Sequence, residues 1–228
     1  MKTTRVLLLT TMNEVDGLQA IWDRIPFELF MRILVIDGHS TDGTREFLAS
    51  KHCETLTQTK PGRGNAIREA MERVTEDVIV LMASDGNDDP SCISQLLRKI
   101  DEGYDIVSGS RFATGGKTDD SDDPFGIRRF GNRFFTSLVN TFWRANYTDS
   151  TCGMRAFTRK AWVELQIGAT KNETEFLMSI RAAKRGLRVC QIPMVEGTRV
   201  GGEVKARSLS TGWCFFMLIL REFFRDTW

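Results

Sequence analysis

The stretch VIDGHSTDGT, residues 35–44, decides the fold, because an apolar segment runs into a glycine-rich polar turn and then into the start of a helix. Residues 32–36 are short, apolar and rich in β-branched side chains, which predicts a strand. In the turn, Asp42 and Thr44 are residue types that cap helices. We therefore expect a strand, a turn and a helix here, with backbone N–H groups pointing outward where the helix begins.

The same alternation continues on both sides of this unit. Strands are predicted at residues 5–9, 77–82, 105–108 and 189–193, and helices at residues 90–102, 128–143 and 173–185. Strands that alternate with helices indicate an α/β fold with a mostly parallel sheet flanked by helices. No linker interrupts residues 1–207, so we expect them to form one domain.

The composition restricts the class of protein. The 228 residues, 41% hydrophobic and 27% charged, are enough to bury one substantial core. The net charge of +1 gives no reason to expect nucleic acid as a partner. The five scattered cysteines, without C-x-x-C spacing, favour free thiols in a reducing compartment. The longest apolar run, residues 213–220, is well short of the roughly 20 residues of a spanning helix.

Polar clusters follow the predicted strands at their carboxyl ends, where parallel sheets bind ligands. These clusters are residues 13–14, 37–44, 84–89 and 109–116. We expect the four loops to converge on one crevice. In the second of them, Asp37 is placed to accept the N–H donors of a nucleobase.

The segment ASDGNDDP, residues 83–90, places acidic and amide oxygens between a strand and a helix, where this fold class positions a diphosphate. Such oxygen ligands suit Mg²⁺ or Mn²⁺. We expect Asp85 and Asn87 to bind the ion. The neighbouring Asp88 and Asp89 are expected to form a solvated acidic helix start.

The segment KPGRGNA, residues 60–66, sets two glycines and two basic side chains before a helix. This pattern is compatible with binding of a phosphate group. It is equally compatible with an ordinary helix entry through glycine and proline.

Taken together, these segments resemble the family-2 glycosyltransferases of the GT-A fold, and within them the polyprenyl-phosphate hexose synthases typified by dolichol-phosphate mannose synthase. The matching segments are TTMNE at 10–14, DGHSTDGT at 37–44, GRGNA at 62–66, SGSRF at 108–112, DSTCGMR at 149–155 and RVGGEVK at 199–205. They occur in the family's order along nearly the whole chain. One departure is that Ala83 stands where the family's D-x-D motif has its first aspartate.

The resemblance implies a Rossmann-like GT-A fold and inverting transfer of a hexose from a nucleotide sugar of the GDP-mannose or UDP-glucose type to a polyprenyl phosphate, with Mg²⁺ or Mn²⁺. The implied nucleotide-binding residues are Thr10, Asn13, Glu14, Asp37, Arg63 and Asp85, and the implied metal ligands are Asp85 and Asn87. The implied catalytic residues are Asp85, Arg111, Arg128 and Arg129, and the acceptor phosphate would meet Arg111, Arg129, Arg199 and Lys205.

The acceptor is predicted from a motif that the chain lacks. Sugar-polymerising relatives carry Q-x-x-R-W beside an aspartate base, whereas Ala161-Trp162 here lacks the preceding Gln and Arg. A lipid phosphate is already an anion near neutral pH and needs no base. Two alternatives stay open: transfer to a hydroxyl of a glycan or small molecule, and a nucleotide-sugar-binding subunit without turnover, which Ala83 suggests.

Residues 208–228 are expected to form an apolar, amphipathic C-terminal helix rich in aromatic side chains. Such a helix suits a membrane surface. It equally suits an oligomer contact or closure of the core. A membrane role would place the protein on the cytoplasmic, inner face of a membrane as a peripheral protein, since reduced cysteines and nucleotide sugars occur there.

Overall fold

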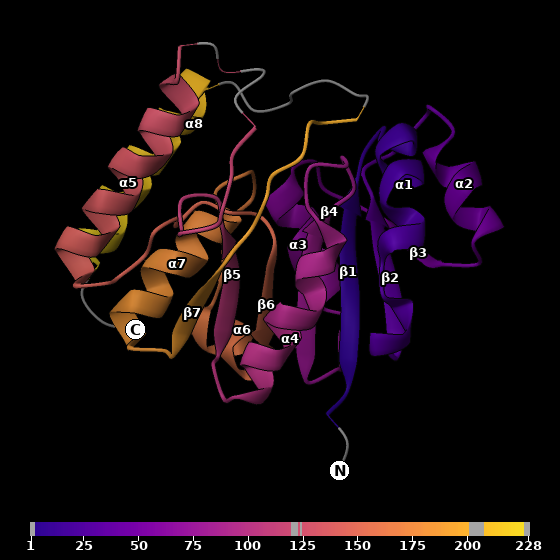
Figure 1. Ribbon diagram of the computed structural model, residues 1–228, viewed down its shortest axis with the longest axis horizontal. Coiled ribbons are helices and arrows are strands. Elements are labelled where there is room, and N and C mark those ends of the chain that lie inside the picture. The colour runs from indigo at the N-terminus through magenta and orange to yellow at the C-terminus, as the bar shows by residue number, and fades with distance from the viewer. Residues whose placement is uncertain (1–2, 120–122, 124, 201–207, 226–228) are drawn as a thin grey trace.

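The computed structural model describes residues 3–119, 123, 125–200 and 208–225 and contains a seven-stranded sheet in the order β3-β2-β1-β4-β6-β5-β7 (Figure 1). The strands are β1 (Arg5–Thr11), β2 (Arg32–Asp37), β3 (Glu54–Thr57), β4 (Val78–Ala83), β5 (Ile106–Ser110), β6 (Arg155–Thr158) and β7 (Val189–Pro193). Only β6 runs antiparallel to its two neighbours among these strands. The predicted α/β fold with a mostly parallel sheet is confirmed.

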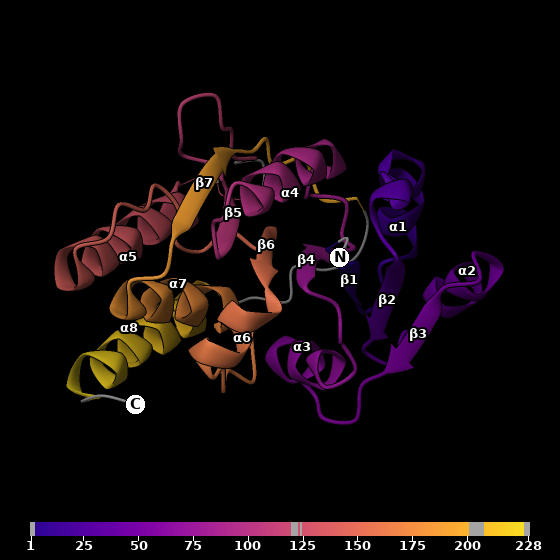
Figure 2. The ribbon, with the colours of Figure 1, turned by 90° about the horizontal axis from the view of Figure 1, so that it is seen from below.

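Helices cover both faces of the sheet (Figure 2). They are α1 (Val15–Ile21), α2 (Thr44–Ser50), α3 (Arg63–Met71), α4 (Ile93–Asp101), α5 (Ile127–Trp143), α6 (Arg159–Leu165), α7 (Thr174–Arg185) and α8 (Ser208–Phe224). In β1, Val6 and Leu8 belong to the core cluster that contains residues of α3 and α7, whereas Leu7 and Leu9 belong to the cluster that contains residues of α1 and α4. A strand covered on both faces has to be apolar throughout, which explains the unbroken apolar run that predicted it.

The C-terminal helix α8 is joined to the core along one side. Phe215, Leu218 and Ile219 are buried against the rest of the chain. Glu222 of α8, fully buried, pairs with Arg181 of α7 at 2.8 Å. Within the described parts of the chain, no helix combines the length and apolarity needed to cross a membrane.

The short elements β3, β6 and α6 were not predicted from the sequence. β3 is an edge strand of four residues with exposed side chains, so it lacks an apolar pattern. β6 also has four residues and carries the buried charge of Arg155, which donates hydrogen bonds to the carbonyl oxygens of Cys152 and Glu175. A charged side chain at a buried strand position hides the strand from a hydrophobicity pattern.

Candidate active site

Two adjoining hollows open at the carboxyl edge of the sheet, which is the upper edge in Figure 1. The first, the polar cleft, has a volume of about 610 Å³, and its walls include Thr10, Glu14, Arg63, Asp85, Asn87 and Arg199. The second, the apolar groove, has a volume of about 760 Å³, and its walls include Phe130, Phe135, Trp213, Phe215 and Phe216. The predicted crevice therefore exists and has a polar part and an apolar part.

The polar cleft contains a bridge of charged side chains. Asp85, two residues after the end of β4, accepts a hydrogen bond from Arg199 at 2.9 Å through Oδ2 and one from the Asn87 backbone N–H at 3.2 Å through Oδ1. The other end of the Arg199 guanidinium pairs with Glu14. The structure thus brings together three predicted residues, Glu14, Asp85 and Arg199, although Arg199 was expected at the acceptor phosphate.

The oxygen atoms next to Asp85 suit a divalent cation. Asn87 Oδ1 is buried and receives no hydrogen bond from any residue that the structure describes. A buried acceptor without a donor is costly unless a ligand satisfies it. No group of three or more His, Cys, Asp or Glu side chains in the described ranges forms a metal site. Two protein ligands match a magnesium-type ion that takes its other ligands from phosphate and water.

Asp88 behaves differently from the prediction of a solvated helix start, which is wrong for this residue. Its side chain is 8% exposed and accepts a hydrogen bond from the Ala83 backbone N–H at 3.1 Å. Burial, and next to it the negative charge of Asp85, raises the pKa of Asp88 to about 7. The hydrogen bond from Ala83, the last residue of β4, holds this carboxyl against the end of the strand. Asp89 does cap the following turn, accepting from the Ser91 N–H at 3.1 Å.

Asp37 and Asn13 hold the loops behind the cleft. The Asp37 carboxylate is 0% exposed and accepts hydrogen bonds from the Ser40 hydroxyl at 2.5 Å and the Ser40 N–H at 3.1 Å. Asn13 Oδ1 accepts from the Thr41 N–H at 2.8 Å. Neither side chain is among the residues that line the cleft, unlike Thr10 and Glu14. A direct contact of Asp37 or Asn13 with a nucleoside stays a prediction.

Arg63, Arg128 and Asn172 line both hollows and therefore mark their junction. Arg63 is the first residue of α3, and its Nε donates to Thr10 Oγ1 at 3.3 Å. Gly62, which precedes it, has φ of 106°, and a Cβ there would collide with the Thr170 carbonyl oxygen. The glycine thus lets the start of α3 lie directly against the loop before α7.

Arg128 and Arg129 are neighbours in the chain, but only Arg128 lies on the walls of the hollows. Arg128, at the junction, donates to the Asp119 carbonyl oxygen at 2.8 Å. Arg129 is exposed and is not among the residues that line either hollow. Its backbone N–H donates to Asp123 at 3.0 Å. Of the two, Arg128 is the one positioned to meet an anion between the hollows.

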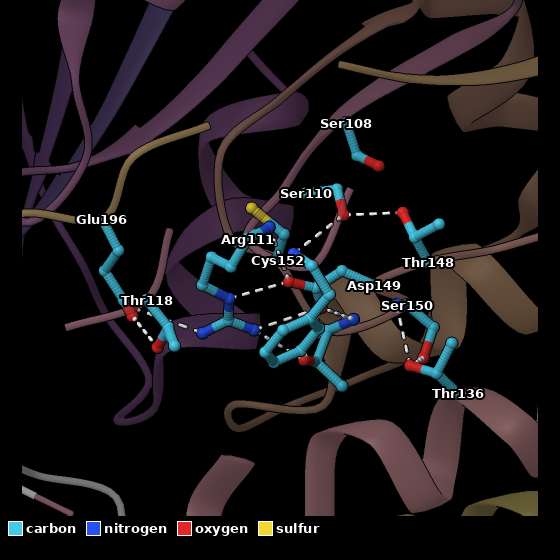
Figure 3. A network of polar contacts seen from close by, with 12 residues as sticks. Ser108, Ser110, Arg111, Thr118, Thr136, Thr148, Asp149, Ser150, Cys152 and Glu196 are labelled. Atoms are coloured by element: carbon cyan, nitrogen blue, oxygen red, sulfur yellow. Dashed lines mark hydrogen bonds and ion pairs between the residues drawn. The ribbon is translucent and has the colours of Figure 1, made fainter. Parts of the chain in front are cut away.

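Arg111 lines the apolar groove, but its guanidinium is held by neighbouring side chains (Figure 3). Nε and Nη2 donate to the two carboxylate oxygens of Asp149 at 2.7 and 3.1 Å, Nη2 also donates to Thr151 at 2.9 Å, and Nη1 donates to Glu196 at 3.3 Å. Burial opposes ionisation of Asp149, but the Arg111 charge outweighs it and lowers the pKa of Asp149. A contact of Arg111 with phosphate stays a prediction, and Lys205 lies outside the described residues.

Glu175 is a site residue that the sequence analysis missed. It lies in the first turn of α7, is 4% exposed, lines the apolar groove and pairs with Arg63. The available signal was an acidic residue beside the apolar Phe176 and Leu177 at the start of a predicted helix. Gln58 and Asn172, which line the polar cleft, lie in connecting segments without a motif and gave no signal.

Comparison with known proteins gives a consistent result. The sequence profile described as glycosyl transferase family 2 matches residues 7–165. Glycosyltransferase AglJ of Haloferax volcanii is 29% identical and is aligned over 95% of this chain and 71% of its own length. A dolichyl-phosphate hexose transferase of the same organism is 28% identical over 74% of this chain and 71% of its own.

A solved structure shows that the fold is GT-A. Glucosyl-3-phosphoglycerate synthase from Mycobacterium tuberculosis, crystallised with Mn²⁺, UDP and phosphoglyceric acid, superposes with a TM-score of 0.80. The superposition covers 99% of this chain and 80% of that one, at 16% sequence identity.

Proposed function

The chain belongs to glycosyl transferase family 2, and from this membership we propose that it transfers a hexose from a nucleotide sugar to a polyprenyl phosphate. The observation that carries the proposal is the apolar groove, whose inner end reaches Arg63 and Arg128 at the edge of the polar cleft. An isoprenoid chain needs apolar walls, and its phosphate needs basic side chains. The relative named dolichyl-phosphate hexose transferase supports this choice of acceptor.

The polar cleft would hold the nucleotide sugar, of the GDP-mannose or UDP-glucose type. Its volume of about 610 Å³ suits a ligand of that size. Asp85 and Asn87 would hold Mg²⁺ or Mn²⁺, which stabilises the negative charge of the departing diphosphate when bound. The Mn²⁺ and UDP named for the solved relative support this assignment.

Arg199 would have to leave Asp85 when the donor binds. Its guanidinium at 2.9 Å now gives Asp85 the positive charge that the cation would supply. Released from the carboxylates, Arg199 becomes available to a phosphate group, the role that the sequence predicts for it.

The proposed reaction needs no general base. A phosphate oxygen of the acceptor attacks the anomeric carbon while the bond to the nucleotide diphosphate breaks on the opposite side, so the configuration inverts. The acceptor oxygen is already anionic near neutral pH. Arg63 and Arg128, lying between the hollows, would orient the two anions and reduce their repulsion.

Glu175 favours a second candidate, transfer to a hydroxyl group. A carboxylate on the groove wall could accept the hydroxyl proton, which is the role of a general base. Its ion pair with Arg63 argues against that role, because the guanidinium already occupies a carboxylate oxygen that would have to receive the proton. The other alternative, a binding subunit without turnover, is disfavoured by membership of a transferase family.

A thermal-shift screen tests the donor half of the proposal. UDP, GDP and their hexose conjugates are each added with Mn²⁺ and with EDTA. A nucleotide that binds the native state raises the melting temperature by mass action. We expect a shift for one nucleotide that requires Mn²⁺ and is lost in Asp85→Ala. Equal shifts with Mn²⁺ and EDTA would contradict the assignment of Asp85 as a metal ligand.

A lipid acceptor also implies contact with a membrane. We propose a peripheral enzyme at the inner face of a membrane, where its acceptor is embedded. The apolar C-terminal helix predicted from the sequence supports this location.

A further inference from the structure

We infer that the outer face shared by α5 and α8 rests on an anionic lipid surface. This aromatic face consists of Phe130, Phe134, Phe142, Trp213, Phe216, Met217, Phe223 and Phe224. The exposed fractions reach 71% for Phe130, 66% for Trp213 and 75% for Phe224. Exposed apolar side chains are ordinary when single, but a contiguous set marks an interaction surface.

The two helices lie side by side in parallel. Phe135 of α5 contacts Phe215 of α8 with ring centroids 5.5 Å apart, and Phe142 contacts Phe223 at 5.2 Å. The inner sides of both helices are already packed, with Val139 of α5 and Leu218 of α8 buried in the core. The exposed rings are therefore a second, outward surface rather than an unfilled part of the core.

The charges on this face select the occupant. Among the described residues of α5, α8 and their immediate ends, the exposed charged side chains are arginines: Arg129, Arg133, Arg144, Arg221 and Arg225. The single acidic residue in either helix, Glu222, is fully buried. It pairs with Arg181 at 2.8 Å and more loosely with Arg221 at 3.6 Å and Arg225 at 3.8 Å, so one carboxylate is shared by several bases and the charge stays positive. A surface with aromatic rings and an excess of positive charge is complementary to acidic head groups above an apolar layer. A second copy of the same face would bring arginines against arginines.

The aromatic face is continuous with the acceptor groove. Phe130, Trp213 and Phe216 belong to both. A polyprenyl chain could therefore pass from a bilayer into the groove between apolar walls, with its phosphate moving toward Arg63 and Arg128. The inference rests on the proposed function in this respect and adds to it the surface, its orientation and the lipid charge.

Flotation with lipid vesicles tests the inference without any acceptor. The full chain is mixed with phosphatidylcholine vesicles that contain or lack phosphatidylglycerol. We compare a triple variant, F134Q/M217Q/F224Q, and a charge variant, R133Q/R144N. All five positions are exposed and lie outside both hollows. The matched control is Met31→Gln with Val163→Gln, two residues exposed by 73% and 64% outside α5 and α8.

We expect the wild type and the control to float with phosphatidylglycerol vesicles and the triple variant to stay unbound. The charge variant should bind these vesicles about tenfold or more weakly, since each basic residue near an anionic surface contributes roughly fivefold. Thermal unfolding checks that the variants fold. Unchanged flotation of both variants would overturn the inference. It would also be overturned if the wild-type protein did not bind the vesicles and instead formed a dimer that the triple substitution dissociates.

Failure of the proposed function would look different. If the protein binds vesicles but does not transfer sugar to polyprenyl phosphate, the membrane-binding surface is supported and the proposed acceptor is rejected. Conversely, transfer to a short-chain, water-soluble polyprenyl phosphate should be the same in the triple variant and the wild type. If the wild-type protein transfers sugar to the polyprenyl phosphate but does not float with the vesicles, the inferred membrane surface is rejected and the proposed function is kept.

Discussion

The polar cleft and the apolar groove differ in what holds their walls in place. The cleft lies at the ends of parallel strands, and its charges are paired across it, as Arg199 is with Glu14 and Asp85. The groove lies between two helices, and its rings continue to the outer surface of the protein. One chain thus separates recognition of a charged ligand from recognition of an apolar one and joins the two at Arg63 and Arg128.

The largest expected effect comes from breaking the network that supports the inner end of the groove. Arg111→Ala leaves the fully buried Asp149 carboxylate without its guanidinium partner. Loss of one partner of a buried ion pair costs about 3–5 kcal/mol, so the free energy of unfolding should fall by that amount. Urea unfolding measures it.

Arg24→Ala is the matched control for Arg111, since Arg24 pairs with Asp89 at the surface with 56% of its side chain exposed. An exposed pair contributes about 0–1 kcal/mol. Equal stability losses in the two variants would show that Arg111 is not a structural residue. If Arg111→Ala lost transfer activity without losing stability, the result would instead support contact of Arg111 with a phosphate group.

The next effect separates the cleft from the groove. Asp85→Ala should lower the transfer rate about 10²–10³-fold, because a preorganised charge that stabilises the leaving diphosphate is lost. Binding of the lipid acceptor should be unchanged. Asp23→Ala, at an exposed position, serves as the control. A variant that retains metal-dependent transfer would exclude Asp85 from the metal site.

Trp213→Ala tests the converse separation, since it should weaken binding of the lipid acceptor and leave binding of the nucleotide sugar unchanged. We expect KM for a long-chain polyprenyl phosphate to rise about tenfold, since an aromatic contact with the lipid worth about 1–2 kcal/mol is removed, roughly one decade in affinity. KM for the nucleotide sugar should not move. The comparison between cleft and groove breaks down if Trp213→Ala changes both constants equally.

The smallest effect concerns pH. The pKa of Asp88 is about 7 in the folded protein, whereas its ordinary value is 3.8. Between about pH 4 and pH 7 the folded protein therefore holds a proton on Asp88 that the unfolded chain does not. The contribution of this group to stability is therefore greatest below about pH 4 and is lost as the pH rises to about 7. Asp88→Asn removes the titration.

The difference in melting temperature between wild type and Asp88→Asn should accordingly become less favourable to wild type from pH 4 to pH 7. Measurement in EDTA avoids an effect of divalent ions. A constant difference across this range would show that Asp88 does not titrate there.

The parts of the fold that the sequence predicts are those with repeated apolar patterns. β1, β2 and β4 were found because buried strands are apolar on both faces. β6 was missed because Arg155 lies in it, and its charge is satisfied only by carbonyl oxygens of residues that the fold brings close. Pattern reasoning cannot detect a partner that is distant in the sequence.

The site shows the same limit. Glu14, Arg63, Asp85 and Asn87 were expected at the crevice, and the structure places all four on its walls. Asp37 is the last residue of β2, at the start of the expected loop, and its buried carboxylate accepts a hydrogen bond from Ser40. The pairing of Arg63 with Glu175, 112 positions apart, depends on the start of α3 lying against the loop that precedes α7, which no single segment encodes.

The most direct test of the account is a transfer assay with two acceptors that differ only in the phosphate. The protein is incubated with Mn²⁺ and a labelled nucleotide sugar, and with either a polyprenyl phosphate or the polyprenol of the same chain length. We predict a labelled lipid product with the phosphate and none with the alcohol. Transfer to the polyprenol, or to a water-soluble hydroxyl acceptor such as 3-phosphoglycerate with no lipid-phosphate product, would contradict it.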